Sequence, residues 1–292
     1  MTVFNVGSLN LDFVYQVDHF VQPGETLLAE SREQFFGGKG FNQSVALARA
    51  GVPVVHAGRI GKDGEVFLDT CKSFGIDTRQ ILVGDEPTGH AIIQIDAAGE
   101  NSILLFGGAN QAITPDDVES FLTDAQANDI LLLQNEVSSM PELIRGAKAK
   151  GMTVAFNPAP MNDAVLSYPL DLVDILILNE TEAEGLSGES DPEAALRAMK
   201  KRTPNAEVIL TLGSKGSAFL DNDTMTLIPA RKATVVDTTA AGDTFVGYYL
   251  SGRLAGQSVG ESIALANRAA AITVQTLGAS NSIPEKNAVP NP

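Results

Sequence analysis

The fold class of this chain is decided by ILLL at residues 130–133, TVAF at 153–156, ILIL at 175–178 and VILTL at 208–212. Each run has four or five residues, almost all of them apolar, which is typical of a strand buried on both faces. Longer stretches with helical periodicity lie between or beside these runs. The alternation predicts a mostly parallel sheet that is covered by helices on both faces.

The same alternation extends outward from these four runs in both directions. Strands are expected at residues 3–7 and 54–58, and helices at 42–50, 65–74, 115–127, 140–150 and 191–201. Past residue 212 the pattern changes to a hairpin, 217–220 and 225–228, around an Asp-Asn-Asp turn. Two long helices, 242–254 and 259–277, complete the pattern.

Residues 12–36 and 88–106 break this alternation. Both stretches contain strands with partial period-two alternation, and their turn residues lie at Pro23-Gly24 and Ala98-Gly99-Glu100. Neither stretch has a helix between its strands. Either a small separate sheet, such as a lid over the main sheet, or an extra hairpin at each edge accounts for this pattern. With a lid, the core comprises residues 1–11, 37–87 and 107–292.

Composition and charge exclude several classes of protein. With 44% hydrophobic and 19% charged residues the chain is too apolar to be disordered, and no apolar run approaches the ~20 residues that span a bilayer. The N-terminal stretch lacks the regions of a signal peptide, and the single Cys71 excludes an intrachain disulfide, so we expect a cytoplasmic protein. A net charge of −16 argues against a nucleic-acid partner, although backbone N–H groups can still hold one nucleotide.

Several well-known site motifs are missing from the sequence. There is no GxxxxGK[ST] phosphate loop, no GxGxxG after the first strand and no GxSxG nucleophile motif. His19, His56 and His90 do not have the spacing of metal ligands. These absences remove most dehydrogenase, hydrolase and zinc-enzyme interpretations.

Two glycine-rich loops remain, and each opens a helix. The first is GGKGFN at residues 37–42, in which three glycines let the backbone approach a ligand closely. Asn42 lies where its side chain could cap the helix or hydrogen-bond a ligand hydroxyl. Taken alone, this loop is equally compatible with a flexible turn followed by an Asn cap.

The second loop is DTTAAGDTF at residues 237–245. Its small residues precede a helix whose first N–H groups are free and whose dipole is positive at that end, which suits an anion. Asp243 lies in the same first turn. Phosphoryl transfer needs both features, because N–H donors neutralise the transferred group while a carboxylate accepts the proton of the attacking hydroxyl. The alternative is that Asp243 only complements the helix dipole, worth ~0.5 kcal/mol.

In this order, about two hundred residues apart, the two loops resemble the two signature sequences of the ribokinase family, which also includes fructokinases and adenosine kinase. The likeness is greatest to the ribokinases of that family, which share the Ala-Ala-Gly-Asp form at 240–243. Further matching stretches are GSLNLD at 7–12, PGET at 23–26, GRIGKD at 58–63, NPAP at 157–160, NETEAE at 179–184 and TLGSKG at 211–216. Chance does not explain an ordered set of this kind.

The resemblance implies a three-layer α/β/α core with a mostly parallel central sheet and a small β-sheet lid. It also implies transfer of the γ-phosphoryl group of ATP to a primary hydroxyl, converting D-ribose to ribose 5-phosphate. Asp243 carries over as the catalytic base. The backbone of Ala240, Ala241, Gly242 and Asp243 carries over as the anion hole.

The resemblance assigns three further sets of residues. For the sugar, the matching positions are Asn10, Asp12, Gly38, Lys39, Asn42 and Glu136, with Ala91, Ile93 and Leu105 as apolar lid positions. For ATP and its Mg²⁺, they are Asn179, Glu182, Thr211, Gly213, Ser214, Gly216 and Asn267. For an activating K⁺, they are Asp237, Thr239, Thr273, Thr276, Gly278 and Ser282. Oxygen ligands suit a hard cation, although Asp237 could also be a plain strand-end turn residue.

The chain also departs from the family pattern. Phe41 stands where ribokinases commonly have alanine, and His90 stands where an apolar lid residue is usual. Both are expected to reshape the rim of the sugar site, so another sugar or a nucleoside stays open as the acceptor. Asn267 replaces a frequent histidine beside the adenine.

Two interpretations lie outside the activity itself. A non-catalytic sugar or nucleotide sensor on the same fold is possible in principle, but the presence of Asp243 disfavours it because a sensor needs no base. A lid sheet has one exposed apolar face. We therefore expect a homodimer that is sealed lid against lid.

Overall fold

The computed structural model describes residues 1–290, and within them it contains two β-sheets. The strands of the larger sheet, in spatial order, are β13 (Thr224–Ile228), β12 (Ser217–Asp221), β11 (Glu207–Thr211), β10 (Ile175–Asn179), β9 (Thr153–Asn157), β8 (Ile130–Gln134), β1 (Val3–Val6), β4 (Val54–Gly61) and β5 (Asp77–Gly84). All neighbouring pairs are parallel except at the β13–β12–β11 edge, where pairing is antiparallel. The predicted parallel sheet and its terminal hairpin are therefore confirmed.

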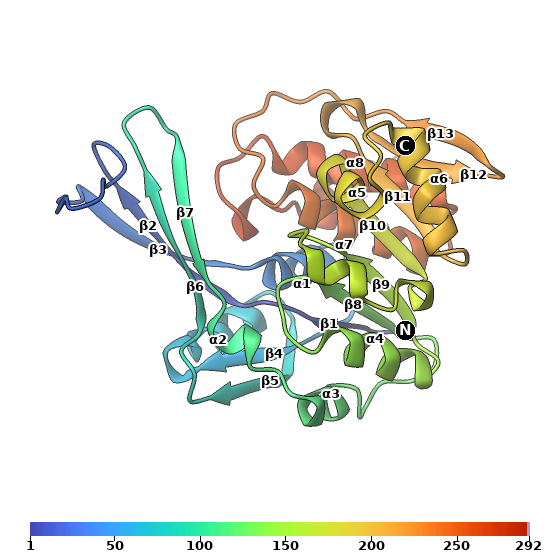
Figure 1. Ribbon diagram of the computed structural model, residues 1–292, viewed down its shortest axis with the longest axis horizontal. Coiled ribbons are helices and arrows are strands. Elements are labelled where there is room, and N and C mark those ends of the chain that lie inside the picture. Colours follow the sequence, from blue (N-terminus) through green and yellow to red (C-terminus); the bar gives the residue numbers. More distant parts are fainter. Residues whose placement is uncertain (291–292) are drawn as a thin grey trace.

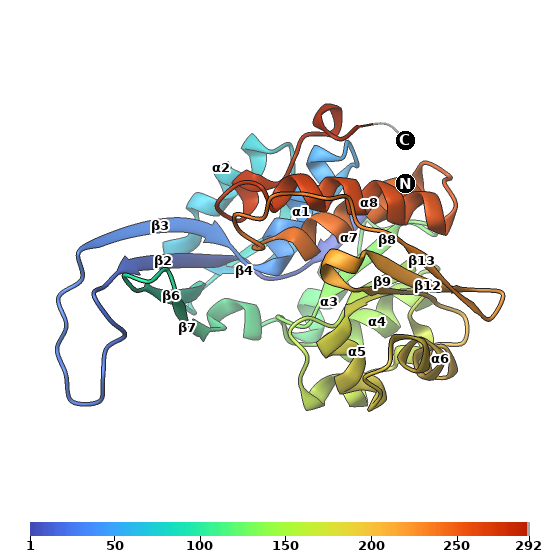
Figure 2. The ribbon, with the colours of Figure 1, turned by 90° about the horizontal axis from the view of Figure 1, so that it is seen from above.

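Helices cover both faces of this sheet, which gives three layers (Figure 2). One face carries α1 (Lys39–Arg49), α2 (Val66–Ser73), α7 (Ala241–Leu254) and α8 (Val259–Thr273), and the other carries α3 (Pro115–Phe121), α4 (Met140–Ala149), α5 (Glu180–Ser187) and α6 (Pro192–Arg202). Two buried apolar clusters correspond to the two interfaces, because successive strand residues point to opposite faces. Within residues 1–290, no helix is long and apolar enough to cross a bilayer.

The remaining strands form a small sheet that projects from the core (Figure 1). In spatial order they are β3 (Ser31–Gly37), β2 (Asn10–Gln16), β6 (Gly89–Ile95) and β7 (Asn101–Phe106). The central pair β2–β6 is parallel and the two outer pairs are antiparallel. The two stretches that lack helices thus pair with one another, and the alternative of a hairpin at each edge of the main sheet is wrong. Whether core and small sheet are separate domains stays a prediction.

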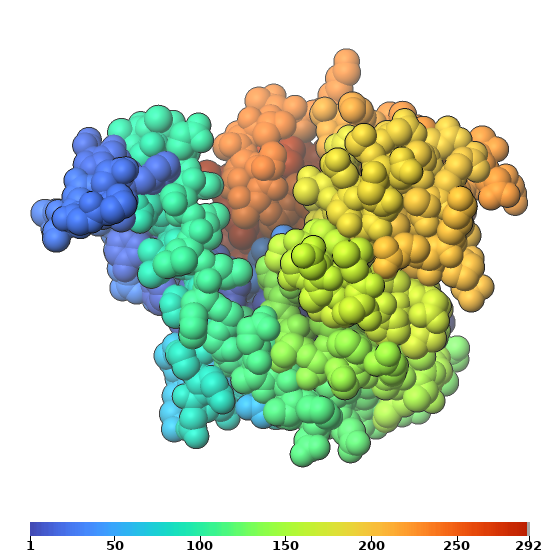
Figure 3. Space-filling view, viewed as in Figure 1, coloured from blue at the N-terminus to red at the C-terminus, as the bar shows by residue number. Residues whose placement is uncertain are grey.

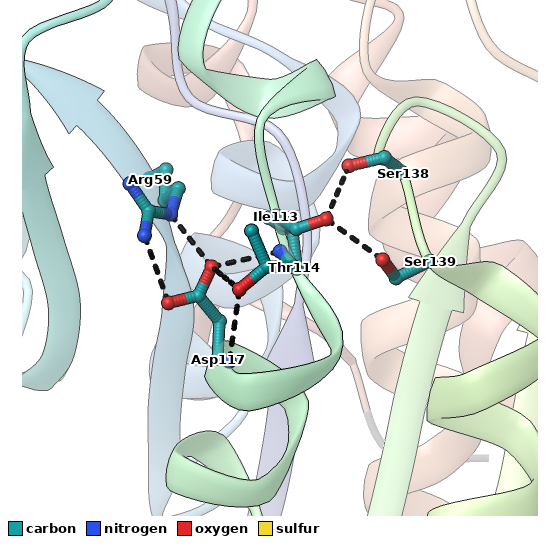
Figure 4. A network of polar contacts seen from close by, with 6 residues as sticks. All are labelled: Arg59, Ile113, Thr114, Asp117, Ser138 and Ser139. Atoms are coloured by element: carbon teal, nitrogen blue, oxygen red, sulfur yellow. Dashed lines mark hydrogen bonds and ion pairs between the residues drawn. The ribbon is translucent and has the colours of Figure 1, made fainter.

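A polar network ties β4 to the start of α3 (Figure 4). Arg59 forms a two-pronged ion pair with Asp117, at 2.8 and 2.9 Å, and Asp117 also accepts hydrogen bonds from the N–H and hydroxyl of Thr114. Ser138 and Ser139 donate to the carbonyl of Ile113 at 2.9 and 2.7 Å. This network connects the end of β4 to the loop after β8, and that loop carries Glu136.

Candidate active site

The order of the strands predicts where a ligand binds. From β1 the chain adds β4 and β5 on one side, and it then returns to place β8 on the other side. In such sheets the crevice lies outside the carboxyl ends of the strands, at the point where the order reverses. The small sheet lies beside this point, and Figure 3 shows a hollow between it and the orange surface of the later chain.

The first glycine-rich loop lies at this crevice, between β3 and α1. Gly38, with φ of 94°, precedes α1, and no side chain caps the helix, so Asn42 is not a cap. Ser8 donates to a carboxylate oxygen of Glu136, and the N–H of Lys39 donates to the same oxygen at 3.0 Å. A Cβ on Gly40 would overlap the backbone of Gly7 and Ser8. The loop therefore holds Glu136 against the start of α1.

Asp243 lies in the first turn of α7, a helix that packs against α1. The residue is 7% exposed, and its carboxylate accepts hydrogen bonds from Asn42 Nδ2 at 3.1 Å and from Gln43 Nε2 at 3.0 Å. Ala240 adopts a left-handed conformation with φ of 60°, and no side chain caps α7. A Cβ on Gly242 would meet open space. The N–H of Ala241 donates to the carbonyl of Thr238, but within residues 1–290 the N–H groups of Gly242 and Asp243 have no partner, so these two are available for an anion beside the Asp243 carboxylate.

Four charged groups share this crevice. Burial lowers the pKa of Lys39, but Asp243, Glu136 and Glu182 outweigh it and raise that pKa above its ordinary value. Burial raises the pKa of Asp243, against the opposing effects of Lys39 and the two amides. Burial likewise raises the pKa of Glu136 and of Glu182. One ammonium therefore balances three carboxylates, which leaves an excess of acceptors for hydroxyl groups.

The side chain of Asn42 has one satisfied end and one free end. Its Nδ2 donates to Asp243, so its Oδ1 must point away from that carboxylate. This Oδ1 is buried and has no hydrogen-bond partner within the described residues. Buried acceptors without partners are rare in folded proteins. The atom therefore fits a ligand that donates a hydrogen bond, such as a sugar hydroxyl.

The small sheet supplies the other polar groups of the crevice. Burial and the neighbouring Glu136 raise the pKa of Asp12 to about 7. Asn10 Oδ1 accepts from Asn110 Nδ2 at 2.8 Å. In the strand register Asp12 lies beside Ala91, which lies beside Leu105, and the next step along that face reaches Ile93. The structure thus aligns the expected polar and apolar sugar positions on one face of the small sheet.

Phe41 and His90 are the two residues that the sequence places at the rim of this site. Phe41 was expected to reshape the rim, and this is wrong: its side chain has no exposed surface and packs edge-on against the rings of Phe36, Phe67 and Phe74. The residue points into the core because Asn42, one position later on α1, occupies the face toward Asp243. His90 lies in the small sheet between the rings of Phe13 and Phe106. In the strand register it is next to Ala91, so its side chain is on the face opposite to Asp12, and the expectation that His90 reshapes the sugar rim is wrong as well.

The expected nucleotide residues follow the carboxyl ends of β10 and β11. Asn179 and Glu182 bond each other in a capping box at the start of α5, and Glu182 is 6% exposed. Thr211 ends β11, and the turn of Gly213, Ser214 and Gly216 follows it. Asn267 on α8 accepts from Ser217 and donates to the carbonyl of Ile228. A hollow of about 450 Å³ beside Asn267 is lined by Ile228, Pro229, Ala230, Arg231, Ala264, Asn267 and Arg268.

The expected cation ligands come from the loop before α7 and the segment after α8. Asp237 accepts from the N–H and hydroxyl of Thr239 and from the N–H of Gly278. Burial raises the pKa of Asp237, but these hydrogen bonds outweigh it and lower the pKa. Asp237, Thr239 and Gly278 are thus brought together. Thr273 and Ser282 are buried and Thr276 is exposed, and within residues 1–290 no hydrogen bond joins these three to the side chain of Asp237.

Comparison with known proteins places this geometry in a family. A model of the pfkB family of carbohydrate kinases matches residues 2–286. The chain belongs to this family.

Named relatives of this pfkB family kinase agree with that assignment. The ribokinase of Staphylococcus aureus (strain COL) is 39% identical over 294 residues, which cover 96% of this chain and 95% of that protein. A deoxyribokinase of Salmonella typhi is 32% identical over 262 residues, which cover 85% and 84%. The structure of Arabidopsis thaliana ribokinase, complexed with ribose and ATP, has a TM-score of 0.86 at 32% identity and covers 99% of this chain and 97% of that one. The predicted family and fold class are confirmed.

Several polar residues of the kinase site were not singled out from the sequence. Asn110 is buried and bonds both the N–H of Leu9 and the side chain of Asn10. Gln43 contacts Asp243 directly, and Gln134 contacts Gln43. Gln43 had a visible signal, because it directly follows Asn42 in the glycine-rich loop. Asn110 and Gln134 had none, because each meets its partners only through the fold.

Proposed function

We propose that this kinase transfers the γ-phosphoryl group of ATP to the primary hydroxyl of D-ribose, giving ribose 5-phosphate, with Asp243 as the general base. The observation that carries the proposal is the position of Asp243: a buried carboxylate in the first turn of α7, where the N–H groups of Gly242 and Asp243 have no hydrogen-bond partner within the described residues. The ribokinase relatives support ribose as the acceptor and ATP as the donor. These assignments stay proposals for this chain.

In the proposed reaction the oxygen of the sugar hydroxyl attacks the γ-phosphorus, and Asp243 accepts the proton that this hydroxyl loses. The bond from that phosphorus to the bridging oxygen breaks, and ADP leaves with the electron pair. The backbone N–H groups of Ala240 to Asp243 would stabilise the negative charge on the transferred group. Asn42, Asp12 and Glu136 would hold the other hydroxyls, because carboxylates and amides accept their hydrogen bonds.

Replacing Asp243 by Asn tests the assignment of the base. The change keeps the size of the side chain and removes the basic oxygen, so we expect turnover to fall at least ~100-fold. Binding of ribose and ATP, followed by calorimetry, should stay within a few-fold of wild type. Turnover of the variant within a few-fold of wild type would contradict the role of Asp243.

For the donor, we propose that the adenine lies in the hollow beside Asn267 and that the phosphates run along Gly213, Ser214 and Thr211 toward α7. Glu182 and Asn179 would hold Mg²⁺ through its waters, since that ion keeps several waters and is completed by substrate phosphates. The carboxylate of Glu182 and the amide oxygen of Asn179 would supply the oxygen atoms for such a role. When bound, Mg²⁺ would neutralise charge on the phosphates.

We also propose a K⁺ site at Asp237, with main-chain oxygens of Thr239, Thr273, Thr276 and Gly278 and with Ser282. The support is that Asp237 and Gly278 meet although they are far apart in the sequence, and that the donor set is all oxygen. A cation there would order the loop that precedes the anion hole. Activation by added K⁺ in Tris buffer should disappear in Asp237→Ala, and equal rates with and without K⁺ in wild type would rule the site out.

A second candidate acceptor is 2-deoxyribose, which the deoxyribokinase relative favours. Within the same chemistry, another sugar or a nucleoside is also open as the acceptor.

The exposed apolar residues of β7 support a homodimer through the small sheet, which we propose as the assembly.

A further inference from the structure

A chain of buried amide side chains lies behind Asp243, on the face of the main sheet that packs against α1. Gln43 Nε2 donates to Asp243 Oδ1 at 3.0 Å and to Asn157 Oδ1 at 3.1 Å. Gln134 Nε2 donates to Gln43 Oε1 at 2.7 Å and to Asn5 Oδ1 at 2.9 Å. Asn5, Gln43 and Gln134 have no exposed surface. None of these amides is among the positions that the resemblance assigns to the sugar or the nucleotide.

One end of this chain is fixed by a backbone carbonyl, which can only accept a hydrogen bond. The carbonyl of Gly40 accepts from Asn5 Nδ2 at 2.7 Å, so Asn5 Oδ1 must be the atom that faces Gln134. Gln134 must then present its NH₂ group, which donates to Asn5 and to Gln43. Gln43 must accept with Oε1 and is left with its NH₂ group toward Asp243.

The other end is fixed independently. The carbonyl of Ile177 accepts from Asn157 Nδ2 at 3.0 Å, so Asn157 Oδ1 is the atom that faces Gln43. An oxygen at that position also requires the NH₂ group of Gln43 as its donor. Both ends therefore dictate the same orientation of Gln43. Turning its amide over would place Oε1 against the carboxylate of Asp243 and would break its hydrogen bonds to Asp243, Asn157 and Gln134.

One atom of this amide network, Gln134 Oε1, is in an unfavourable environment. Gln134 Oε1 is buried and has no partner within the described residues, and any Cβ on Gly7 would overlap it. A buried acceptor without a partner is destabilising, and an apolar side chain at this position would avoid it. The NH₂ group of Gln134, which orients Gln43, gives a reason for a polar residue here.

We propose that Gln43, oriented by Gln134 and Asn157, is a positioning residue that keeps the carboxylate of Asp243 ionised and turned toward the acceptor hydroxyl. The inference rests on the proposed role of Asp243 as the base. Other charged groups also act on Asp243: Lys39 of α1 attracts it, whereas Glu136 and Glu182 repel it. Burial and the repulsion both disfavour the charged form of Asp243. The hydrogen bonds from the neutral amides favour that charged form and so oppose both effects.

The test compares Gln43→Met and Gln134→Met with a matched control, Leu132→Met, which lies two residues before Gln134 on the same face of β8. In Gln43→Met the acid limb of the kcat/KM profile should move up by about one pH unit, because a hydrogen bond to the charged carboxylate is lost. At pH values above the limb, kcat/KM should recover to within a few-fold of wild type. Gln134→Met should give a smaller move in the same direction, and Leu132→Met should give none.

Carboxyl-carbon NMR of Asp243, assigned by its loss in Asp243→Asn, measures the same pKa without turnover. An unmoved Asp243 resonance pKa in Gln43→Met, or an equal loss of kcat/KM at every pH, would overturn the role of Gln43. If the resonance moves and the acid limb does not, Gln43 acts on the carboxylate as proposed, and it is the assignment of Asp243 as the base that fails. Should Gln43→Met not fold, Gln134→Met decides the question by the same measurements.

Discussion

At the scale of single residues, Asn42 connects the proposed sugar site to the proposed base, Asp243. Its Nδ2 is committed to Asp243, and this leaves its buried Oδ1 for a ligand. A sugar hydroxyl that donates to Oδ1 would complete the hydrogen bonding of this side chain. The same contact would place the sugar within reach of Asp243. In the proposed reaction, sugar binding and the orientation of Asp243 would therefore be coupled through one amide.

Asp12 should decide between ribose and 2-deoxyribose. A buried acceptor that loses its hydroxyl partner costs ~1–3 kcal/mol, so kcat/KM for ribose should exceed that for 2-deoxyribose by roughly ten- to a hundred-fold. In Asp12→Ala this ratio should collapse toward one, mainly through loss of activity on ribose. The measurement is kcat/KM for ribose, 2-deoxyribose, fructose and a nucleoside side by side.

The KM for ATP provides the internal control, because Asp12 lies on the small sheet and the proposed nucleotide positions lie on the core. If 2-deoxyribose or the nucleoside is the better substrate of the wild-type enzyme, ribose is the wrong acceptor, although the kinase family stands.

The resemblance predicts roles for Asp243, Asn42 and Lys39 because each lies in a stretch that resembles a family signature, and for Glu136 as a matching position outside those stretches. It did not identify Gln134, whose partner Gln43 is 91 positions away along the chain. A polar residue at the end of an apolar strand has no local signature. Its role appears only when the sheet places it beneath α1. Phe41 shows the opposite error, because position in a motif does not reveal which way a helical side chain points.

At the scale of elements, the start of α3 depends on the ion pair between Arg59 and Asp117. The side chain of Asp117 is 9% exposed and that of Arg59 is 21% exposed, so the pair is largely desolvated. Removing one partner leaves a partly buried guanidinium without its carboxylate. We expect Asp117→Ala to lower the free energy of unfolding by about 2 kcal/mol, measured by urea denaturation. Asp116→Ala, at the exposed neighbouring position, should change it by less than about 0.5 kcal/mol.

The effect of Asp117→Ala should also depend on pH. Burial raises the pKa of Asp117, but the hydrogen bonds from Arg59 and Thr114 outweigh it and lower that pKa below its ordinary value of 3.8. A lowered folded-state pKa contributes stability that is complete above the ordinary value and is lost as pH falls through the folded value. The destabilisation by Asp117→Ala should therefore be smaller at pH 3 than at pH 7. An equal loss of unfolding free energy at pH 3 and pH 7 would contradict the ion pair as the cause of the destabilisation.

Most elements could be predicted because their apolar periodicity is strong. The parallel strands other than β5, the β12–β13 hairpin and α7 begin and end within a few residues of the expected positions. Helix α5 was missed because it is short and follows β10 directly, so that only its capping box marks its start. Strand β5 was missed because, at the edge of the sheet, it carries charged and polar residues such as Asp77 and Arg79. The expected helix over 115–127 ends at Phe121, since Thr123 and Asp124 begin a polar turn.

At the scale of the whole molecule, the two sheets have different surroundings. Helices cover both faces of the nine-stranded sheet, whereas the small sheet projects from the core with no helix on its outer side (Figures 1 and 2). All six residues of β7 are exposed. Leu104 is 68% exposed, and its neighbour in the register, Ile92, is 36% exposed. These two residues lie on the face opposite to Asp12, which leaves an apolar surface outside the sugar site.

This apolar surface fits an interface between two copies of the chain. Two copies that pair through their small sheets would cover Leu104 and Ile92, and a carboxylate buried in such an interface would be unpaired. We therefore expect wild-type enzyme to be a dimer by light scattering, and Leu104→Glu to be a monomer at the same concentration. Leu227→Glu is the matched control, because Leu227 is a similarly exposed leucine, at 48%, on the edge strand β13. It should leave the dimer intact. A monomeric wild type, or a Leu104→Glu variant that remains dimeric, would rule out assembly through this face of the small sheet.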